Sequence, residues 1–453
     1  MADVISEPVA AARRLRKPPM LKGLPLVGNL PDFLKHQDAM FHRGYAEHGP
    51  IFGVRIGPQR GVALVGPRYS EMFFREVDNK LSIPELYKFV IPMFGEVIMS
   101  ARDGETRRRH VRLLQSAFQG RRLSRYMDDM RAETTAWLDS LGDSGEFEVW
   151  SALEPLSMRV AATALMGPEV RARIDEFRPL LVDLARGMEF VLPPNLPLPK
   201  FRRRDRARRL LTEMIRPVLA ERRAHPGRDH DFLQTLVDDP SLRSAEGEDD
   251  AALVGMALGT IFTGYITTAA QMSWALVKLL KHPDYARTVV TEIDTARASG
   301  EPTWRTRLSR LDWAVREAVR LRPVMSHYAR LNTVDYEVDG YLLPKGWLTI
   351  ICPSVAHRLP EVFTDPEAYD PERFSPERAE DHRHPYAMIG FSGGFYRCPG
   401  SAFGMGEMNV VIGMLLERFD LALATPSPAT DFDLGIIRPA PPCVVRYRRR
   451  PVA

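Results

Sequence analysis

A run of 27 residues without a charged side chain, 251–277, is the feature that most constrains how this chain can fold. A helix of roughly 20 apolar residues can cross a bilayer, so a membrane span is one interpretation of the run. The run also holds six Thr, Gln or Ser residues and three glycines, which pack better against other helices than against lipid. We therefore expect a long helix buried at the centre of a domain, and no membrane anchor.

Around this run the chain alternates between short β-rich stretches and long helical ones. Alternating apolar and polar residues, broken by turn residues, predict strands at 50–66 and 334–352 and a last short hairpin at 435–447. Apolar residues at helical spacing fill most of 105–300 and 401–418. Because no repeat or flexible linker divides the chain, we expect a mostly α fold with small β regions. It forms a single domain, 21–453, after an N-terminal arm, 1–20.

Charge and cysteine content exclude several classes of protein. Lys and Arg number 62 against 58 Asp and Glu, and this net charge of +4 is too small to indicate nucleic-acid binding. Three cysteines, Cys352, Cys398 and Cys443, rule out a disulfide framework and fit a reducing compartment. We expect a cytoplasmic monomer with no nucleic-acid partner.

The strongest chemical signal is the ten-residue stretch FSGGFYRCPG, 391–400. A cysteine binds a metal as a thiolate, and the free N–H groups at a helix N-terminus stabilise a thiolate. Cys398 stands just before the predicted helix 401–418, and Gly393 and Gly394 leave room for backbone to lie against a flat ring. The alternative is a buried structural cysteine beside a Pro-Gly turn.

This stretch resembles the haem-thiolate loop of cytochrome P-450 monooxygenases, in which the cysteine is the axial iron ligand. Glu317 and Arg320, in the sequence EAVR, are similar to the family's ExxR pair, and Arg373, in PERF, to the arginine that joins it. The stretch TGYITT, 263–268, resembles the oxygen-activating groove of the family's central helix. The resemblance covers nearly the whole chain. It implies a P-450-type domain whose long central helix lies over a buried haem b.

The resemblance also implies roles for individual residues. Thr267 and Thr268 would supply hydroxyl groups for catalysis, while Glu317, Arg320 and Arg373 would form a structural ion-pair network. The stretch YKFVIPMFGE, 87–96, is similar to one branch of the family, the sterol 14α-demethylases. The implied haem contacts are Cys398, Tyr87, Arg109, His110, Arg330, Phe391, Tyr396 and Gly400. The implied substrate pocket comprises Phe89, Phe94, Gly264, Ile266, Met325, His327, Tyr328 and Ile436.

Two positions depart from the family's pattern. The family usually has an acid before the helix threonine, and the sterol branch a histidine. This chain has Ile266, which can neither donate nor relay a proton. The basic residue common two positions before the cysteine is here Tyr396, which can hydrogen-bond a haem propionate but cannot neutralise it near pH 7. These departures weigh against sterol demethylation itself.

The function implied is a haem-thiolate monooxygenase that activates dioxygen to oxidise a medium to large apolar natural product: a terpenoid, a steroid-like ring system or a polyketide. Electrons would come from a ferredoxin or comparable donor, docking near Arg397 and the arginines of 107–112. A haem-binding sensor or carrier without turnover and a peroxide-driven oxidase remain as alternatives. For the haem-contact arginines the alternative is a solvated charge, and for His327 a structural role.

Overall fold

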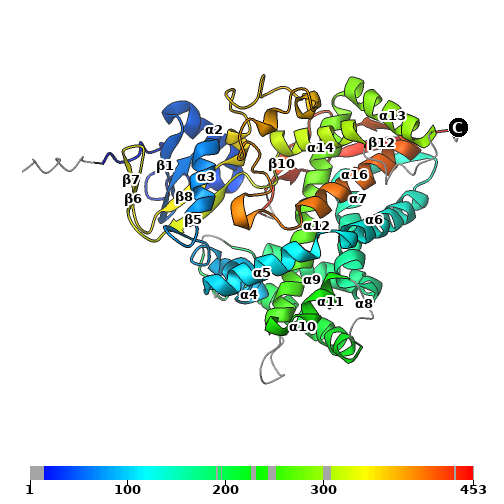
Figure 1. The fold of residues 1–453 in the computed structure, drawn as a ribbon, viewed down its shortest axis with the longest axis horizontal. Coiled ribbons are helices and arrows are strands. Elements are labelled where there is room, and N and C mark those ends of the chain that lie inside the picture. The colour runs from blue at the N-terminus through cyan, green and yellow to red at the C-terminus, as the bar shows by residue number, and fades with distance from the viewer. Residues whose placement is uncertain are drawn as a thin grey trace, which may run out of the picture.

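The computed structural model describes residues 15–189, 192–194, 196–225, 231–242, 251–298, 308–432 and 435–451. In this part of the chain helices form most of the molecule, and the largest sheet lies at one end (Figure 1). The fold is that expected: mostly helical, with small sheets and one long central helix.

The largest sheet has five strands in the order β1-β2-β8-β5-β3. Its members are β1 (Ile51–Ile56), β2 (Gln59–Leu64), β8 (Leu348–Ile351), β5 (Tyr328–Asn332) and β3 (Leu81–Ser82). All neighbouring pairs are antiparallel except β2 with β8, which are parallel. A second sheet joins β4 (Ser144–Glu148), β12 (Val444–Arg449) and β9 (Phe419–Leu423). Two hairpins pair β6 (Tyr336–Val338) with β7 (Tyr341–Leu343), and β10 (Thr430–Asp431) with β11 (Arg438–Pro439).

The α-helices before the central one are α1 (Leu30–Lys35), α2 (Gln37–His48), α3 (Pro67–Arg75), α4 (Ile91–Phe94), α5 (Gly104–Ala117), α6 (Arg121–Ser140), α7 (Val149–Ala161), α8 (Pro168–Ala172), α9 (Ile174–Arg186), α10 (Pro199–Ala224) and α11 (Phe232–Asp238). The others are α12 (Ala251–Leu280), α13 (Pro283–Ala298), α14 (Ser309–Leu321), α15 (Pro353–Ala356) and α16 (Ser401–Arg418). Short 3-10 or π turns include η1 (Tyr87–Val90), η2 (Ile98–Ser100), η3 (Ala162–Met166), η4 (Pro240–Leu242), η5 (Pro371–Phe374), η6 (Glu380–His382) and η7 (Gly394–Tyr396).

Part of the expected N-terminal arm belongs to the folded body. Residues 1–14 lie outside the described residues. Arg16 donates its N–H to the carbonyl of Gly340 at 2.9 Å, and Met20 forms a bridge with Gly53 of β1. The described end of the arm therefore pairs with β structure before position 21.

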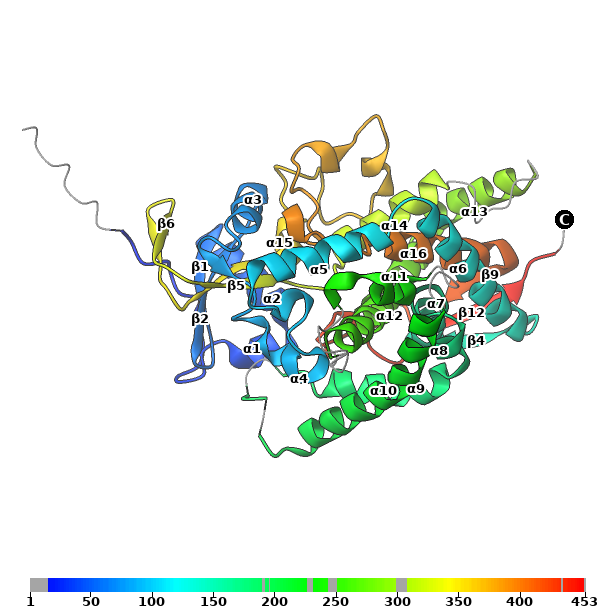
Figure 2. The same cartoon turned by 60° about the horizontal axis from the view of Figure 1, so that its bottom comes forward.

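Helix α12 passes through the middle of the helical part (Figure 2). It is long and apolar enough to cross a membrane, yet 72% of its most apolar window is buried inside the structure. It packs on α7, α14 and α16, as a core helix does. Gly255 permits one close approach, because a Cβ there would lie 2.0 Å from the carbonyl oxygen of Phe94.

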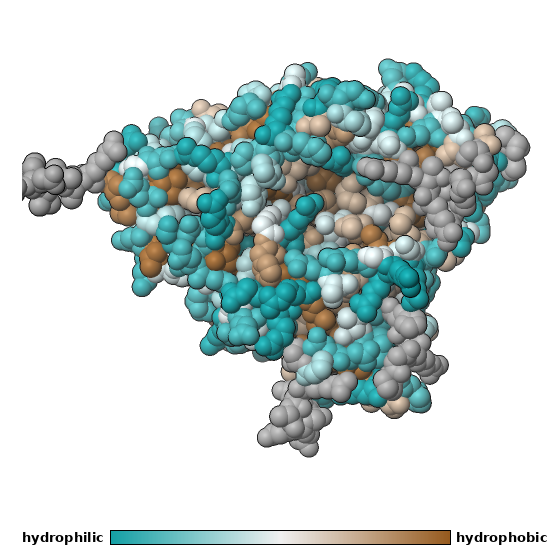
Figure 3. All heavy atoms as spheres, in the orientation of Figure 1, coloured by the Kyte–Doolittle hydropathy of each residue, from teal (hydrophilic) through white to brown (hydrophobic). Residues whose placement is uncertain are grey.

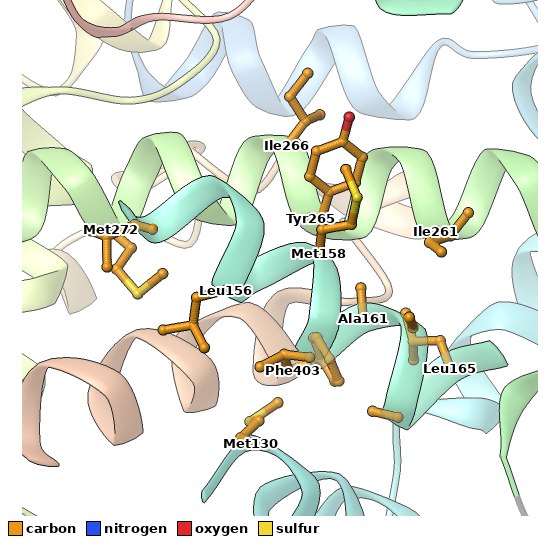
Figure 4. Packing of buried hydrophobic residues seen from close by; sticks show 14 of the residues in the cluster. Met130, Leu156, Met158, Ala161, Leu165, Ile261, Tyr265, Ile266, Met272 and Phe403 are labelled. Carbon is orange, nitrogen blue, oxygen red and sulfur yellow. The ribbon is translucent and has the colours of Figure 1, made fainter. Parts of the chain in front are cut away.

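The core between these helices is built from large apolar side chains. Figure 4 shows Leu156 and Met158 of α7, Tyr265 of α12 and Phe403 of α16 gathered in it. All four are almost fully buried. This packing fixes α16, and with it the loop that carries Cys398, relative to the central helix.

Candidate active site

Cys398 stands at the end of a tight loop that leads into α16. Its backbone N–H donates to the carbonyl of Phe391 at 2.8 Å, and the N–H of Arg397 donates to the carbonyl of Gly394 at 3.2 Å. Ser392 and Gly394 have φ of 63° and 60°, a left-handed conformation that is easiest for glycine. The loop folds back on itself and presents Cys398 three residues before α16 begins.

The loop glycine Gly393 does lie against a flat ring, but that ring belongs to the protein. A Cβ at Gly393 would lie 2.7 Å from ring atoms of Phe74 in α3. Phe74 in turn stacks on Tyr386 with 5.7 Å between ring centroids. Because Gly393 has no side chain, Phe74 of α3 can pack directly against the backbone of the loop.

The thiol of Cys398 lies deep in the molecule but keeps partial exposure. Burial raises the pKa of Cys398 above its usual value, whereas a hydrogen bond from the N–H of Gly400 and the charge of Arg397 act to lower this pKa. Gly400 is the N-cap residue of α16, so a helix N-terminus and a guanidinium both favour the thiolate. A metal ion would favour it further, because ligation requires a deprotonated sulfur.

An accessible stripe interrupts the buried surface of α12. Thr263 is exposed, and Gly264 and Thr267 are half-buried, although most of the helix around them is buried. Thr267 follows Thr263 by four residues and Gly264 by three, so these positions lie on one face of the helix. Because α12 runs through the interior, this face borders an internal space. The space-filling view is hollowed near its centre, with apolar residues in the hollow (Figure 3).

The two predicted catalytic threonines face different surroundings. Thr267 donates its hydroxyl to the carbonyl of Thr263 at 2.8 Å and lies on the accessible stripe. Thr268 donates to the carbonyl of Gly264 at 2.7 Å and is buried against α16, where its hydroxyl would be 3.4 Å from a Cβ at Gly404. Only Thr267 is in position to hold a water at the accessible face.

Arg330 of β5 is a buried guanidinium that pairs with no carboxylate among the described residues. It is 1% exposed, its Nη1 donates only to the carbonyl of Ala329, and its Nε has no partner among the described residues. The guanidinium carbon lies 5.1 Å from the ring centre of Phe73 and 5.8 Å from that of Tyr87. Burial lowers the pKa of Arg330, while Tyr87 raises it. An enclosed cation of this kind requires an anion to complete it.

Tyr396 is held in a network with Arg107 and Asp78. Its hydroxyl accepts from Nε of Arg107 at 3.1 Å and donates to Asp78 at 3.0 Å. Arg107 also forms an ion pair with Asp78 and donates to the carbonyl of Ala101 at 2.6 Å. This network satisfies the hydroxyl of Tyr396 within the protein. The sequence placed Arg107 among the arginines that dock an electron donor, but its 2% exposure shows that it is buried and does not belong to such a surface.

The structure corrects the prediction for Arg109. Its side chain is 46% exposed and makes a long 3.9 Å pair with Glu105. Arg107 lies on the buried face of α5 instead, because these two positions are 200° apart on a helix of 3.6 residues per turn. His110 is buried, but its Nδ1 accepts the N–H of Ile98 at 3.1 Å. That nitrogen therefore anchors the neighbouring turn.

Glu317, Arg320 and Arg373 form the expected ion-pair network, and all three are fully buried. Glu317 of α14 receives both Nε and Nη2 of Arg320, at 2.7 and 2.8 Å, and Nε of Arg373 at 3.1 Å. Arg373 reaches a second carboxylate, Glu380, at 2.7 Å. Hydrogen bonds to charged partners lower the pKa of Glu380 to about 2 against the cost of burial. The network ties α14 to the segment before the thiolate loop.

The predicted pocket residues come from segments that meet beside α12. The rings of Phe94 and Phe262 lie 5.4 Å apart, and Phe89 stacks on Tyr87 at 5.6 Å. The N–H of Ile437 donates to the carbonyl of Val324 at 3.0 Å, which brings Ile436 beside the segment that holds half-buried Met325. Ile266 is 3% exposed. Because its side chain is aliphatic, this position of α12 carries no titratable group.

His327 and Tyr328 differ in what their polar atoms do. The hydroxyl of Tyr328 donates to the carbonyl of Gly390 at 2.9 Å, so it holds the thiolate loop. Nδ1 of His327 lies 2.9 Å from Oγ of Ser326, and its ring lies against Phe33 and Phe41. Burial lowers the pKa of His327 to about 4, so the imidazole is neutral at physiological pH.

These residues fit an iron protoporphyrin. Cys398 is an accessible thiol at a helix N-terminus, as an axial ligand must be. Arg330 is a buried cation that lacks an anion, which a propionate would supply. The accessible stripe on α12 provides an apolar space with a hydroxyl, that of Thr267, on its border.

Comparison with known proteins supports the same assignment. The family model Cytochrome P450 matches residues 18–446. The sterol 14-demethylase of Arabidopsis thaliana is 32% identical over 97% of this chain and 93% of its own length. The sterol 14alpha-demethylase of Mycolicibacterium vanbaalenii is 30% identical over 93% and 96%. Retinoic acid-bound cyanobacterial CYP120A1 has a TM-score of 0.85 at 26% identity, covering 96% of this chain and 100% of that chain. The chain therefore belongs to the cytochrome P450 family, the haem-containing monooxygenases.

Proposed function

We propose that this P450 oxidises a medium to large apolar natural product of the terpenoid, steroid-like or polyketide class. The observation that carries the proposal is the accessible face of α12, bordered by aromatic and aliphatic side chains. Enclosed apolar sites with few polar groups select ligands of this kind. Sterol demethylases among the relatives, and a structural neighbour that binds retinoic acid, lend support.

Each part of the site has a role in this proposal. Haem bound through Cys398 supplies dioxygen activation, which a thiolate ligand favours. Arg330, with Tyr87 beside it, binds a propionate, and the Tyr396–Arg107–Asp78 network supports the same side. Thr267 holds a water at the accessible face of α12, and the surrounding apolar side chains exclude bulk water.

His327 gives this pocket a hydrogen-bond acceptor. The hydroxyl of Ser326 donates to Oε1 of Gln37 at 2.8 Å, so its oxygen meets the imidazole as an acceptor. Nδ1 of His327 therefore carries the proton, and Nε2, which no described residue bonds, is left with its lone pair. His327 lies deep in the molecule, but its side chain is only partly buried. Its Nε2 can therefore accept a hydrogen bond from a substrate hydroxyl.

Spectral titration tests this acceptor role. Paired ligands, a ring alcohol and the corresponding ketone, are titrated into the wild type and into His327→Phe while the haem spin state is followed. The alcohol should bind about tenfold more tightly than the ketone in the wild type, an order of magnitude set by one hydrogen bond. The variant should lose that preference. An equal preference in both proteins contradicts the assignment of His327.

Electrons come from a separate acidic donor of the ferredoxin class. Arg112 and Arg397 are exposed near the thiolate loop, and the side chain of Gln115 joins α5 to this loop through the carbonyl of Phe395 at 3.2 Å. Arg109 is exposed on the same helix. We place the protein in the cytoplasm as a monomer. Reduction should slow with added salt and in Arg112→Glu, because both weaken charge attraction.

The decisive experiment is the absorption spectrum of the reduced, carbon monoxide-bound protein, followed by a ligand screen with the electron donor supplied. A thiolate-type spectrum, together with oxygenated product from a terpenoid, steroid-like or polyketide ligand, supports the proposal. Cys398→Ala should lose the spectrum. Ligand binding without product would indicate a haem sensor or carrier, and product from peroxide alone a peroxide-driven oxidase.

A further inference from the structure

Glu407 is a buried acid that the site described above does not use. It lies in α16 and is 0% exposed, and neither of its carboxyl oxygens has a hydrogen-bond partner among the described residues. A buried carboxylate without donors is far less stable than a carboxyl group that keeps its proton. Burial accordingly raises the pKa of Glu407 to about 8, and the hydroxyl of Ser157 acts in the opposite direction.

The surroundings of Glu407 are the packed core between α7, α12 and α16. Phe403, one turn before Glu407 on α16, points into this core with Leu156 and Tyr265 (Figure 4). Three charged groups on the packed elements are engaged elsewhere: Glu154 of α7 binds Arg178, Arg159 of α7 pairs with Glu133, and Asp312 of α14 binds Asn409. Helix α6 also packs on α16 and carries Asp129, whose pKa burial raises to about 6. Among the described residues of this layer, Glu407 is thus the buried acid whose carboxyl oxygens have no hydrogen-bond partner.

Two contacts connect this layer to the threonine stretch of α12. Oγ of Ser157, the hydroxyl that acts on Glu407, donates to the carbonyl of Tyr265 at 3.2 Å. Gly404 lies three residues before Glu407, on the same side of α16, and packs against the hydroxyl of Thr268. Ser157 and Thr268 are therefore hydroxyl groups on the two sides where α7 and α16 meet the threonine stretch of α12.

The reaction of this family consumes protons, which must reach the site through the protein or its water. A substrate C–H bond, dioxygen, two electrons and two protons give an alcohol and one water, so each turnover consumes two protons. Helix α12 carries no charged side chain from 251 to 277, and its position before Thr267 is Ile266. The protons must therefore enter from outside α12.

We propose that Glu407 is the internal proton source of this enzyme. It releases a proton by way of the hydroxyls of Ser157 and Thr268 toward the accessible face of α12, and it takes a proton back from water after each turnover. Glu407 touches neither haem nor substrate, so it acts through these hydroxyls. The proposal depends on the family's dioxygen chemistry and not on the substrate class.

Glu407→Gln tests the proposal, because it keeps the shape of the side chain and removes the exchangeable acid. Glu417→Gln, the same change at a half-buried position later in α16, is the matched control. The infrared band of a protonated carboxyl group should be present at pH 7 in the wild type and the control, with and without haem, and absent in Glu407→Gln. Glu407→Gln should also form several-fold more peroxide per electron consumed and show a larger solvent deuterium isotope effect.

A second variant, Ser157→Ala, leaves the acid in place and removes one hydroxyl. It should keep the infrared band and still raise peroxide formation. The reduced carbon monoxide spectrum should stay thiolate-type in every variant, which separates proton supply from haem binding. A Glu407→Gln enzyme with wild-type peroxide yield and isotope effect overturns the proposal, as does a carboxyl band that survives this substitution. Peroxide formation is measured whatever the ligand, so a wrong substrate class does not affect the result.

Discussion

The hydroxyl of Tyr396 lies 3.1 Å from Nε of Arg107 and donates to Asp78 at 3.0 Å. The basic residue common at this position of the family is thus replaced by a tyrosine that meets a guanidinium from α5. Positive charge beside position 396 is retained, but it comes from a different helix and is shared with a carboxylate. The hydrogen-bonded tyrosine also fixes the loop before Cys398 to that helix.

Arg107→Ala should therefore destabilise the protein, because it leaves Asp78 and the hydroxyl of Tyr396 without their partner. Loss of one member of a buried pair typically costs about 3 kcal/mol. Arg109→Ala should change the free energy of unfolding by less than about 0.5 kcal/mol, since that side chain is exposed and its ion pair is long. Urea unfolding of the two purified variants measures the difference. Equal losses would show that Arg107 is not the buried member of the pair.

Arg330→Met should affect the haem-free and haem-bound proteins in opposite directions. In the haem-free protein the substitution removes a buried cation without a carboxylate partner, so the free energy of unfolding should rise or stay unchanged. Haem affinity should fall at least tenfold, because a charged hydrogen bond to a propionate is lost. Unfolding of the haem-free protein and haem titration measure the two effects. Destabilisation of the haem-free protein with unchanged haem affinity would contradict the propionate role.

The buried ion-pair network that includes Glu380 makes the free energy of unfolding depend on pH in the acid range. The pKa of Glu380 is about 2 in the folded protein, below its ordinary value of 4.5. A depressed pKa contributes stability that is complete above about pH 4.5 and is lost as pH falls toward 2. Glu380→Gln should be less stable at pH 7, and its stability should fall less steeply over this acid range. Thermal unfolding across the range, with Glu372→Gln as an exchange in the same segment, tests the prediction. An unchanged pH slope would show that Glu380 does not bind its arginines in solution.

Gly255 and Gly264 of α12 should respond differently to alanine. A Cβ at Gly255 would lie 2.0 Å from the carbonyl oxygen of Phe94, whereas one at Gly264 would meet only Leu165 at 3.4 Å. Gly255→Ala should force α4 away from α12 and cost about 1–3 kcal/mol. Gly264→Ala should be neutral or stabilising by up to about 1 kcal/mol, the helix propensity that alanine gains over glycine. Unfolding of both variants decides between these effects, and an equal response would mean that α4 moves freely.

The sequence predicted the features that depend on local pattern. The uncharged run at 251–277 indicated a buried helix because a charge in that core would be costly, and α12 is that helix. The ExxR spacing places Glu317 and Arg320 on one helix face, so their pairing could be expected. Strands were recognised at 50–66 and 334–352, but β5 and β9 were not. The hairpin expected at 435–447 was wrong, because β11 pairs with β10 and β12 with β4 and β9. Such pairing joins residues distant in sequence.

Contacts across the fold were harder to predict. Three consecutive arginines gave no sign of which one is buried, since that depends on the orientation of α5 against Asp78 and Tyr396. The hydrogen bond of Tyr328 could not be predicted for a similar reason, because its partner, the carbonyl of Gly390, is 62 residues away. Nothing in the sequence pattern distinguishes Glu407 from the other acids of the chain. Only the packing of three helices reveals that this acid has no partner.

Strand β5 links two parts of the proposed haem site. Tyr328 and Arg330 are two residues apart, so they share one face of the strand. One side chain holds the loop of Cys398, and the other is a buried cation with no carboxylate partner among the described residues. A slip of one residue in the pairing of β5 with β8 would turn both side chains away together. The amount of haem bound per chain purified from cells would then measure the fraction of chains in which β5 pairs with β8 in the correct register.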